Sequence, residues 1–299
     1  MIIVRLWGGL GNQMFQYAFG YAFAKNNQTE LLLDTRFYTD SFLKANPHFS
    51  KQKAHILGFP IEYREQVNLH NEYRAINFLQ KRLVSRIIRI PKKFAVTVED
   101  GIRYYKETRL KVYPELISLK DENVYFDGYW QSEQYFQKYK DELVTQFTIC
   151  NDNIKAEIEK YDVSSENAIS VHLRLGDYAA KKKILSQYNY VISPEFYLMA
   201  MDKLRSRIDN PRFLVFSNNV TKAKEILGNK YDYTIINEDR HLSDIEEFMV
   251  MSKCRHHIIS NSTFSWWAAW INDKGYTIAP DVFFGNEAII PEKWEKVRF

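Results

Sequence analysis

Cysteine is scarce in this chain of 299 residues. Its two cysteines, Cys150 and Cys254, form no spaced motif for a metal ion or for redox chemistry. A disulfide framework is therefore not expected, and a reducing compartment fits the composition. The N-terminal apolar stretch, residues 2–7, ends at a glycine turn too soon for a signal peptide or a membrane span. These absences together predict a protein that is made and kept in the cytoplasm.

A large charge of one sign is also lacking. The 41 Lys and Arg against 37 Asp and Glu leave a formal net charge of +4, so the composition requires no nucleic-acid partner. The segment 81–93 is an exception, because it interleaves basic residues with apolar ones at helical spacing and contains no acid. Such a helix could make peripheral contact with the inner membrane or approach an acidic partner, and an ordinary solvated helix face is the alternative.

An Asp-x-Asp pair occurs nowhere in the sequence. Metal-dependent enzymes that act on nucleotide sugars commonly need such a pair to hold the cation on the diphosphate. A diphosphate bound here would depend on a guanidinium group and a helix N-terminus instead. We therefore expect no bound metal ion and no metal ligands.

Aromatic residues are plentiful, with 20 Tyr, 20 Phe and 6 Trp. Such a composition often accompanies the binding of flat or sugar-like ligands. Aromatic side chains also fill protein cores, and we expect most of them to do so here.

The spacing of apolar residues predicts an α/β fold. Residues 2–7 read as a strand, residues 12–25 have helical spacing after a glycine turn, and residues 30–34 read as a second strand, which is a β-α-β opening. Residues 35–165 are harder to interpret, apart from a strand-like 124–126. Beyond them we predict strands near 168–175, 212–217, 233–236, 256–260 and 276–279, with helices near 194–208, 221–228, 243–254 and 262–272.

This alternation predicts a second, doubly wound domain with a parallel sheet. Polar residues around 150–166 suggest the boundary. We therefore predict an N-terminal α/β domain over 1–155 and a C-terminal Rossmann-like domain over 156–299. The two parallel sheets would belong to facing domains, and a last helix could pack back on the first domain.

Four predicted strands are followed by small or hydrogen-bonding residues, at 8–13, 176–178, 217–219 and 260–263. Ligands of open parallel sheets bind beyond the carboxyl ends of the strands. One such cluster would be a turn or a helix cap. Four of them are better explained by a polar ligand.

An arginine and a histidine stand in the otherwise apolar strand that begins near residue 168. His172 and Arg174 are two residues apart and therefore project to the same side of the strand. A guanidinium group suits a phosphate, because its planar fork can bind two oxygens at once. The alternative is an arginine paired with a buried carboxylate.

The glycine turn after the first strand has part of a dinucleotide-binding pattern. Gly9 and Gly11 follow a strand, and Asp34 ends the next one. The third glycine position is Met14, however, which argues against a nicotinamide cofactor. Asn12 is expected to cap the helix or to hydrogen-bond a ligand from its start.

Two further clusters each allow two interpretations. Ser262 and Thr263 could cap the following helix, or the helix start could offer backbone amides to a diphosphate, which Arg174 nearby would favour. The segment 217–219 is either a capping turn or a hydrogen-bonding edge for a base or ribose.

Several segments together resemble a known enzyme family. They are residues 7–17 (WGGLGNQMFQY), 126–136 (FDGYWQSEQYF), 171–178 (VHLRLGDY), 216–219 (FSNN) and 259–267 (ISNSTFSWW). In this combination and order the chain resembles the α-1,2-fucosyltransferases of glycosyltransferase family 11. The resemblance implies a GT-B fold and an inverting transfer of fucose from GDP-β-L-fucose to a galactoside or oligosaccharide acceptor. Animal members carry a membrane anchor, so this chain looks like a bacterial member.

The resemblance also implies roles for individual residues. His172, Arg174 and Asp177 stand where the family's signature faces the nucleotide sugar, and Asn12 reaches the site from the other domain. Arg174 would stabilise the leaving GDP. Asp177 is our first candidate for the general base, and a turn-forming residue or one that orients Arg174 is the alternative. Weaker candidates for the base are Asp127 and Glu133.

The remaining predictions concern binding. We expect GDP-fucose to be a substrate and no cofactor to be needed. Rival interpretations are a fucosyltransferase of another linkage such as α-1,6, a transferase for another nucleotide sugar, and a catalytically silent glycan-binding protein. The predicted nucleotide-binding residues are Gly9, Gly11, Asn12, Gln13, His172, Arg174, Ser217, Asn218, Asn219, Asn261, Ser262, Thr263 and Phe264.

Overall fold

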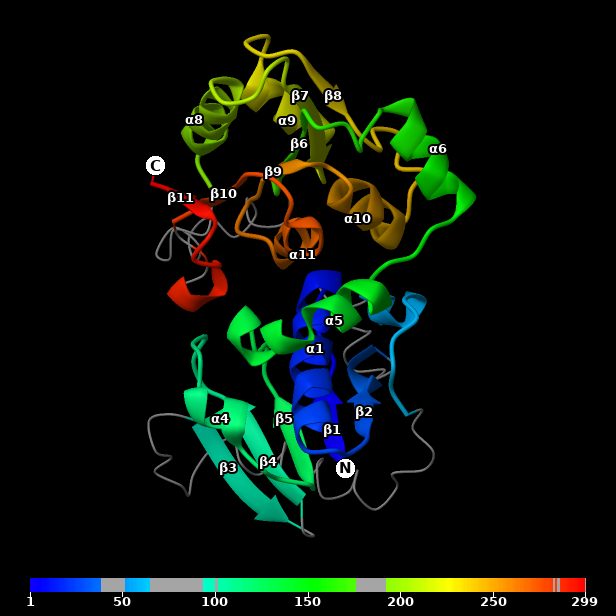
Figure 1. Cartoon of the computed structure of the whole chain (residues 1–299), viewed down its shortest axis with the longest axis vertical. Helices are drawn as coiled ribbons and strands as arrows, with labels where there is room; N and C mark the ends of the chain where they lie inside the picture. Colours follow the sequence, from blue (N-terminus) through cyan, green and yellow to red (C-terminus); the bar gives the residue numbers. More distant parts are fainter. Residues whose placement is uncertain are drawn as a thin grey trace. The chain divides into compact units, whose positions relative to one another are not determined.

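The chain divides into two compact units, Met1–Phe147 and Thr148–Phe299, each with its own sheet (Figure 1). The computed structural model describes residues 1–38, 52–64, 94–99, 102–175, 192–281, 283 and 286–298. The predicted boundary at 155–156 lies inside helix α6 (Asp152–Lys160). This helix is part of the second unit, because it packs on α10 (Asp244–Ser252) and the side-chain amides of Asn151 and Asn153 donate to Glu246.

The sheet of the first unit has the strand order β2-β1-β5-β4-β3. Its strands pair in parallel except β3, which is antiparallel to β4. This antiparallel pair departs from the all-parallel sheet that we predicted. Only two residues join β3 to β4, and a parallel connection needs a long crossover. The strands are β1 (Ile2–Arg5), β2 (Leu31–Asp34), β3 (Phe94–Glu99), β4 (Ile102–Glu107) and β5 (Val124–Asp127).

Helix α1 (Leu10–Asn26) is apolar on nearly all sides and is buried almost throughout. Aromatic rings surround it: Phe19 stacks on Trp130 at 4.6 Å between centroids and meets Phe126 edge-on at 4.8 Å. Aromatic residues thus fill much of this core, as expected. The other elements of the unit are η1 (Arg36–Tyr38), η2 (His55–Gly58), α4 (Pro114–Ser118), η3 (Glu133–Tyr135), η4 (Gln137–Tyr139) and α5 (Lys140–Gln146).

The second unit contains the parallel, doubly wound sheet that the alternation of strands and helices predicts. Its order is β11-β10-β9-β6-β7-β8, and the five predicted strands and four predicted helices are present. The strands are β6 (Ala168–Leu173), β7 (Arg212–Ser217), β8 (Tyr233–Ile235), β9 (His256–Ile258), β10 (Thr277–Pro280) and β11 (Glu295–Val297). The helices, besides α6 and α10, are α8 (Pro194–Arg205), α9 (Val220–Leu227), α11 (Thr263–Asn272) and the short η7 (Glu287–Ile289).

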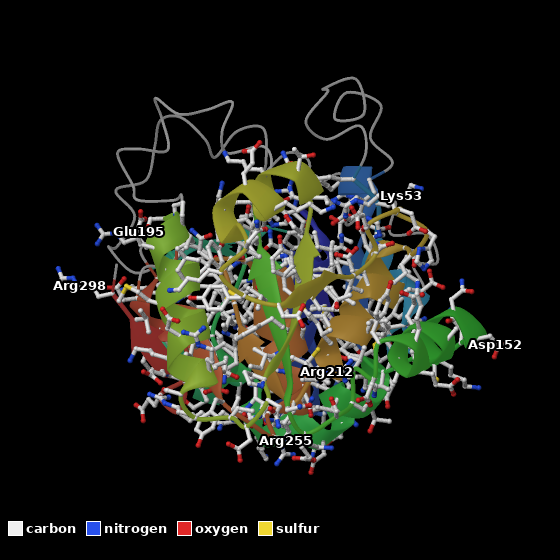
Figure 2. All side chains as sticks on the ribbon, turned by 90° about the horizontal axis from the view of Figure 1, so that it is seen from above. Lys53, Asp152, Glu195, Arg212, Arg255 and Arg298 are labelled. Atoms are coloured by element: carbon white, nitrogen blue, oxygen red, sulfur yellow. The ribbon has the colours of Figure 1, made fainter. Side chains whose placement is uncertain are left out.

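The strand order of this sheet reverses between β6 and β9. The chain passes from β6 outward to β7 and β8, then returns to β9 on the other side of β6 and continues to β10 and β11. Helices cover both faces: α8 and α9 pack on one (Figure 2, where Glu195 lies in the first turn of α8), and on the other α10 packs against both α6 and α11. Open sheets of this order bind ligands where the order reverses.

Three expectations concern the C-terminal end of the chain and the segments outside the described residues. The last regular element of the described residues is strand β11, which pairs with β10, whereas we expected a helix that packs on the first domain. The basic segment 81–93 and Asp177 lie outside the described residues. Among the residues described, no helix is long and apolar enough to cross a membrane.

Candidate functional site

The carboxyl ends of β6 and β9 are linked by a histidine and a serine at the point where the strand order reverses. His172 lies near the end of β6, and its Nδ1 is 3.0 Å from the hydroxyl oxygen of Ser260, just beyond β9. Both side chains are buried. The structure thus brings His172 and the segment 260–263 together at one edge, which adjacent parallel strands require.

His172 is uncharged at physiological pH. Burial, aided by the charge of Arg174, lowers the pKa of its imidazole to about 3. The ring also lies 5.8 Å from that of Phe264 in α11. A neutral, enclosed imidazole can hold its neighbours in place, and the predicted catalytic role of His172 stays a prediction.

Arg174 follows β6 directly and is exposed to solvent. In the described part of the chain no carboxylate lies within ion-pair distance of it, so the buried ion pair that we considered as an alternative is not found there. Arginines at the opposite, amino edge differ. Arg212 pairs with Asp162, and Arg255 pairs with Glu166 at 3.1 Å (Figure 2).

Helix α11 begins at this edge with Ser262 as its N-cap residue. The Ser262 side chain makes no capping hydrogen bond, and Asn261 beside it is buried. A helix N-terminus carries a partial positive charge and unpaired backbone N–H groups, which suit an anion. Thr263 and Phe264 form the first turn of this helix.

The segment 217–219 is a capping turn. Ser217 Oγ donates to the Leu173 carbonyl at 2.9 Å, which ties β7 to β6. Asn218 Oδ1 accepts from the Leu175 N–H at 2.8 Å, and Asn219 Oδ1 caps α9. These bonds fix the backbone on both sides of Arg174, and of the three residues in this turn Asn218 and Asn219 are exposed.

The glycine turn stands at the corresponding edge of the first sheet. Gly8 has φ +81, and a Cβ there would lie 2.7 Å from Nδ2 of Asn12. Gly9 is the N-cap residue of α1, and Gly11 is buried in its first turn. Asn12 Oδ1 accepts from the side-chain amide of Gln131, beyond β5, at 3.0 Å.

Gln13 has a structural role that the sequence did not show. Its side chain is fully buried, donates to the carbonyls of Gly8 and Lys53, and accepts from the N–H of Ile56. Its hydrogen bonds fasten residues 53–56 to the glycine turn. Both the amide nitrogen and the amide oxygen of Gln13 are used in these bonds within the protein.

The carboxylates of the first unit that could act as a general base differ in their surroundings. Asp127 is buried against Arg5 at 3.1 Å and accepts from the Tyr104 hydroxyl, so its carboxylate is already held in an ion pair. Glu133 lies in η3. Glu107, which we did not single out from the sequence, ends β4, and burial raises its pKa to about 7. The signal for it was weak, a charged residue that ends a short aromatic strand.

Among the residues described, no group of three His, Cys, Asp or Glu side chains could hold a metal ion. The polar groups at the reversal point of the second sheet are one arginine, a helix N-terminus, a neutral histidine and small hydroxyl or amide side chains. Such a set suits a phosphate-bearing ligand.

Two α/β units, the second with the strand order of Rossmann nucleotide-binding domains, define a protein of the GT-B type. The chain belongs to glycosyltransferase family 11, whose family model matches residues 1–295. This confirms the resemblance found in its sequence motifs.

Known proteins similar to this chain include bacterial and animal ones. It is 31% identical to an alpha-1,2-colitosyltransferase of Escherichia coli, over 99% of both chains. It is 25% identical to galactoside alpha-(1,2)-fucosyltransferase 2 of Gorilla gorilla gorilla, over 98% of this chain and 78% of that protein. Among solved structures, fucosyltransferase NodZ from Bradyrhizobium aligns with a TM-score of 0.49 and 14% identity, over 89% of this chain and 91% of that one.

Proposed function

We propose that the protein transfers L-fucose from GDP-β-L-fucose to the 2-hydroxyl of a galactoside, with inversion to an α-1,2 linkage and without a metal ion. The observation that carries this proposal is Arg174. It stands at the reversal point of a Rossmann sheet, beside the start of α11, with no carboxylate partner among the described residues. The family and the α-1,2-specific names of its relatives support the reaction.

Residues of the second unit would have different roles in stabilising the leaving GDP. The transition state is oxocarbenium-like, and the departing diphosphate gains negative charge. Arg174 and the first-turn amides of α11 are preorganised donors for that charge. His172 stays neutral and holds Ser260, which keeps the start of α11 against β6. The sequence offers Asp177 two roles, as general base or as the carboxylate that orients Arg174.

A second candidate donor follows from the 31% identity with a colitosyltransferase. Colitose is fucose without its 3-hydroxyl. A site that hydrogen-bonds this hydroxyl would reject the deoxy sugar strongly, whereas a site without such a contact would accept both. The ratio of kcat/KM for the two GDP sugars therefore distinguishes a fucosyltransferase from a colitosyltransferase.

The decisive experiment incubates the protein with GDP-fucose or GDP-colitose and a panel of galactosides, and determines the product linkage by NMR. An α-1,2-fucosylated galactoside is the expected product. An α-1,6 linkage in the product, or a strong preference for GDP-colitose over GDP-fucose, would contradict the proposed reaction. Glycan binding without transfer or donor hydrolysis would favour the silent glycan-binding protein.

We also propose that the first unit binds the acceptor and that residues 81–93 can contact an anionic membrane. The charge pattern of the segment supports the second point. Flotation with liposomes that contain anionic lipid, compared with neutral liposomes, tests it. Equal recovery with both lipids would remove the membrane role and leave the transfer reaction untouched.

A further inference from the structure

Three carboxylates stand at the carboxyl edge of the first sheet, at the ends of β2, β5 and β4. Two of them are paired with arginines: Asp34 with Arg36 at 2.6 Å and Asp127 with Arg5 at 3.1 Å. The third, Glu107, has no cation within ion-pair distance in the described ranges. Asp34 and Asp127 are thus held in ion pairs within the protein, whereas Glu107 is not.

The two oxygens of Glu107 have different surroundings. Oε2 accepts from the backbone N–H groups of Tyr129 at 2.7 Å and Trp130 at 3.4 Å. Oε1 is buried and has no hydrogen-bond partner. The turn is fitted closely around the carboxylate, because a Cβ at Gly128 would lie 2.5 Å from that of Glu107. Trp130 has φ +55, a strained value for a bulky residue that is retained mainly where function requires it.

An aromatic pair lies beside this carboxylate. The ring of Tyr129 stacks on that of Trp7 with centroids 4.1 Å apart, and both side chains are partly exposed. The indole N–H of Trp7 is buried without a partner. Buried polar groups are nearly always hydrogen-bonded, so an unfilled donor and an unfilled acceptor at one edge indicate a missing ligand group.

A sugar matches this combination. Its hydroxyl groups both donate and accept hydrogen bonds, and the C–H groups on one face of a galactose ring can lie against an aromatic ring. Just beyond the turn, the paired amides of Asn12 and Gln131 add further polar atoms. The edge therefore offers an apolar face, a donor and an acceptor within a few residues of one another along β1, β4 and β5.

We infer that this edge of the first unit binds the acceptor sugar and that Glu107 is the general base for the hydroxyl that is glycosylated. The inference rests on the proposed function. As the hydroxyl oxygen bonds to the anomeric carbon, its proton passes to Oε1 of Glu107. The bond from that carbon to the diphosphate oxygen breaks, and its electron pair leaves on GDP. On this inference Asp177 is not the general base.

The environment of Glu107 supports proton transfer near neutral pH. Burial raises its pKa to about 7, and the charge of Asp127 acts in the same direction, whereas the two backbone donors oppose it. Tyr104 on β4 and Tyr135 in η3 also face this cluster, and burial raises the pKa of both, so they stay protonated. Arg5 on β1 remains charged. Of these groups, Glu107 alone changes charge near pH 7, where a general base is most effective.

The test compares Glu107→Gln with the wild-type protein. Glutamine can still accept from the Tyr129 and Trp130 N–H groups, but it cannot take up a proton. We expect kcat to fall about 100-fold or more, with GDP affinity unchanged, and the acid limb of the wild-type pH–kcat profile near pH 7 to disappear. Glu157→Gln is the matched control, because Glu157 is also buried with an unpartnered oxygen but lies in the second unit.

Two results would overturn the inference. One is a Glu107→Gln protein within threefold of wild-type kcat that retains the acid limb. The other is loss of that limb in Asp177→Asn, which would identify Asp177 as the base. Trp7→Phe keeps an aromatic ring but removes the indole donor. It is expected to raise KM for the acceptor about tenfold and to leave KM for GDP-fucose unchanged.

A measurement on the unaltered protein covers the case in which Glu107→Gln does not fold. The Glu107 carboxyl can be followed by 13C NMR across pH 5–9, with and without lactose as the galactoside probe. Its titration midpoint should shift when lactose binds, and an unchanged midpoint at saturating lactose would contradict the inference. If the protein transfers no fucose to any galactoside, the proposed function fails, and this titration still reports whether the edge binds a sugar.

Discussion

The imidazole of His172 and the hydroxyl of Ser260 form a buried hydrogen bond, 3.0 Å from Nδ1 to Oγ, that joins β6 to the segment after β9. It crosses the point where the strand order reverses. The bond holds the start of α11 beside Arg174. Its removal should therefore affect stability and GDP binding together.

Ser260→Ala is expected to lower the free energy of unfolding by about 1–3 kcal/mol, because it leaves a buried imidazole nitrogen without a partner. Urea unfolding at pH 7 measures this. Ser206→Ala is the control, since the Ser206 hydroxyl is exposed at the end of α8 and should contribute less than about 0.5 kcal/mol. Equal stabilities of the two variants would show that the His172–Ser260 bond is dispensable.

Acid should destabilise the protein through its buried neutral histidines. Burial lowers the pKa of His172 and of His257 to about 3, whereas a histidine in the unfolded chain titrates near 6.5. Between these values the unfolded chain binds more protons. Stability is therefore full above pH 6.5 and falls as the pH drops, by up to about 1.4 kcal/mol per pH unit for each histidine.

Urea unfolding at pH 7, 6 and 5 tests this dependence with His257→Asn, which should show a shallower loss of stability on acidification. His241→Asn should instead show a steeper loss of stability on acidification than the wild type. A hydrogen bond to Asp239 raises the pKa of His241, so this residue stabilises the folded state below pH 6.5 and loses that effect as the pH rises. Parallel pH profiles for the wild type and His257→Asn would refute the assignment of a neutral His257.

Arg174→Ala should abolish transfer and weaken GDP binding by about 10- to 150-fold, because it removes a charged hydrogen-bond donor from the phosphate. Isothermal titration with GDP measures the affinity. Arg205→Ala on α8 is a suitable control, since Arg205 forms an exposed pair with Asp202. GDP affinity equal to that of the wild type would remove Arg174 from the phosphate site.

The two glycines of the first turn should respond differently to a side chain. Gly8→Ala places a Cβ at φ +81 and against Asn12, so we expect a loss of about 1–3 kcal/mol and disruption of the Asn12–Gln131 pair. Gly9→Ser suits the N-cap of α1, where φ is −79 and no atom crowds the Cβ. It should fold normally, and a loss of transfer would then mean that a substrate passes close to Gly9. Thermal unfolding and kinetics separate the two effects.

Transfer should continue at full rate in excess EDTA, because Arg174 and the start of α11 supply the positive charge that a cation would otherwise provide. The assay uses protein dialysed against the chelator. Loss of activity that manganese restores would contradict the proposal of a metal-independent mechanism.

The second unit could be predicted almost completely from its sequence. Its strands are continuous apolar runs separated by amphipathic helices, so each element is visible by itself. Strand β11 was missed, since three residues with two charges among them give no apolar run. In the first unit the β3–β4 hairpin was missed for another reason. It breaks the alternation of strands and helices on which the prediction depended.

The candidate site was predicted where it depends on neighbouring strand ends, and missed where it depends on distant backbone atoms. His172 and Ser260 follow from the rule that parallel strands end at one edge. Gln13 does not, because its partners at Lys53 and Ile56 lie about 40 residues away. Glu107 does not either, since its pKa depends on burial and on two amides that no sequence pattern shows.

The reversal of strand order also has a consequence for synthesis of the chain. His172 and Ser260 are separated by 88 residues, and strands β7 and β8 lie between them in the sequence. A nascent chain that has exposed β6, β7 and β8 can pair three strands, but it still lacks the serine and the helix start. The proposed phosphate site therefore forms late, after most of the second unit has left the ribosome, and a chain truncated before α11 would lack it.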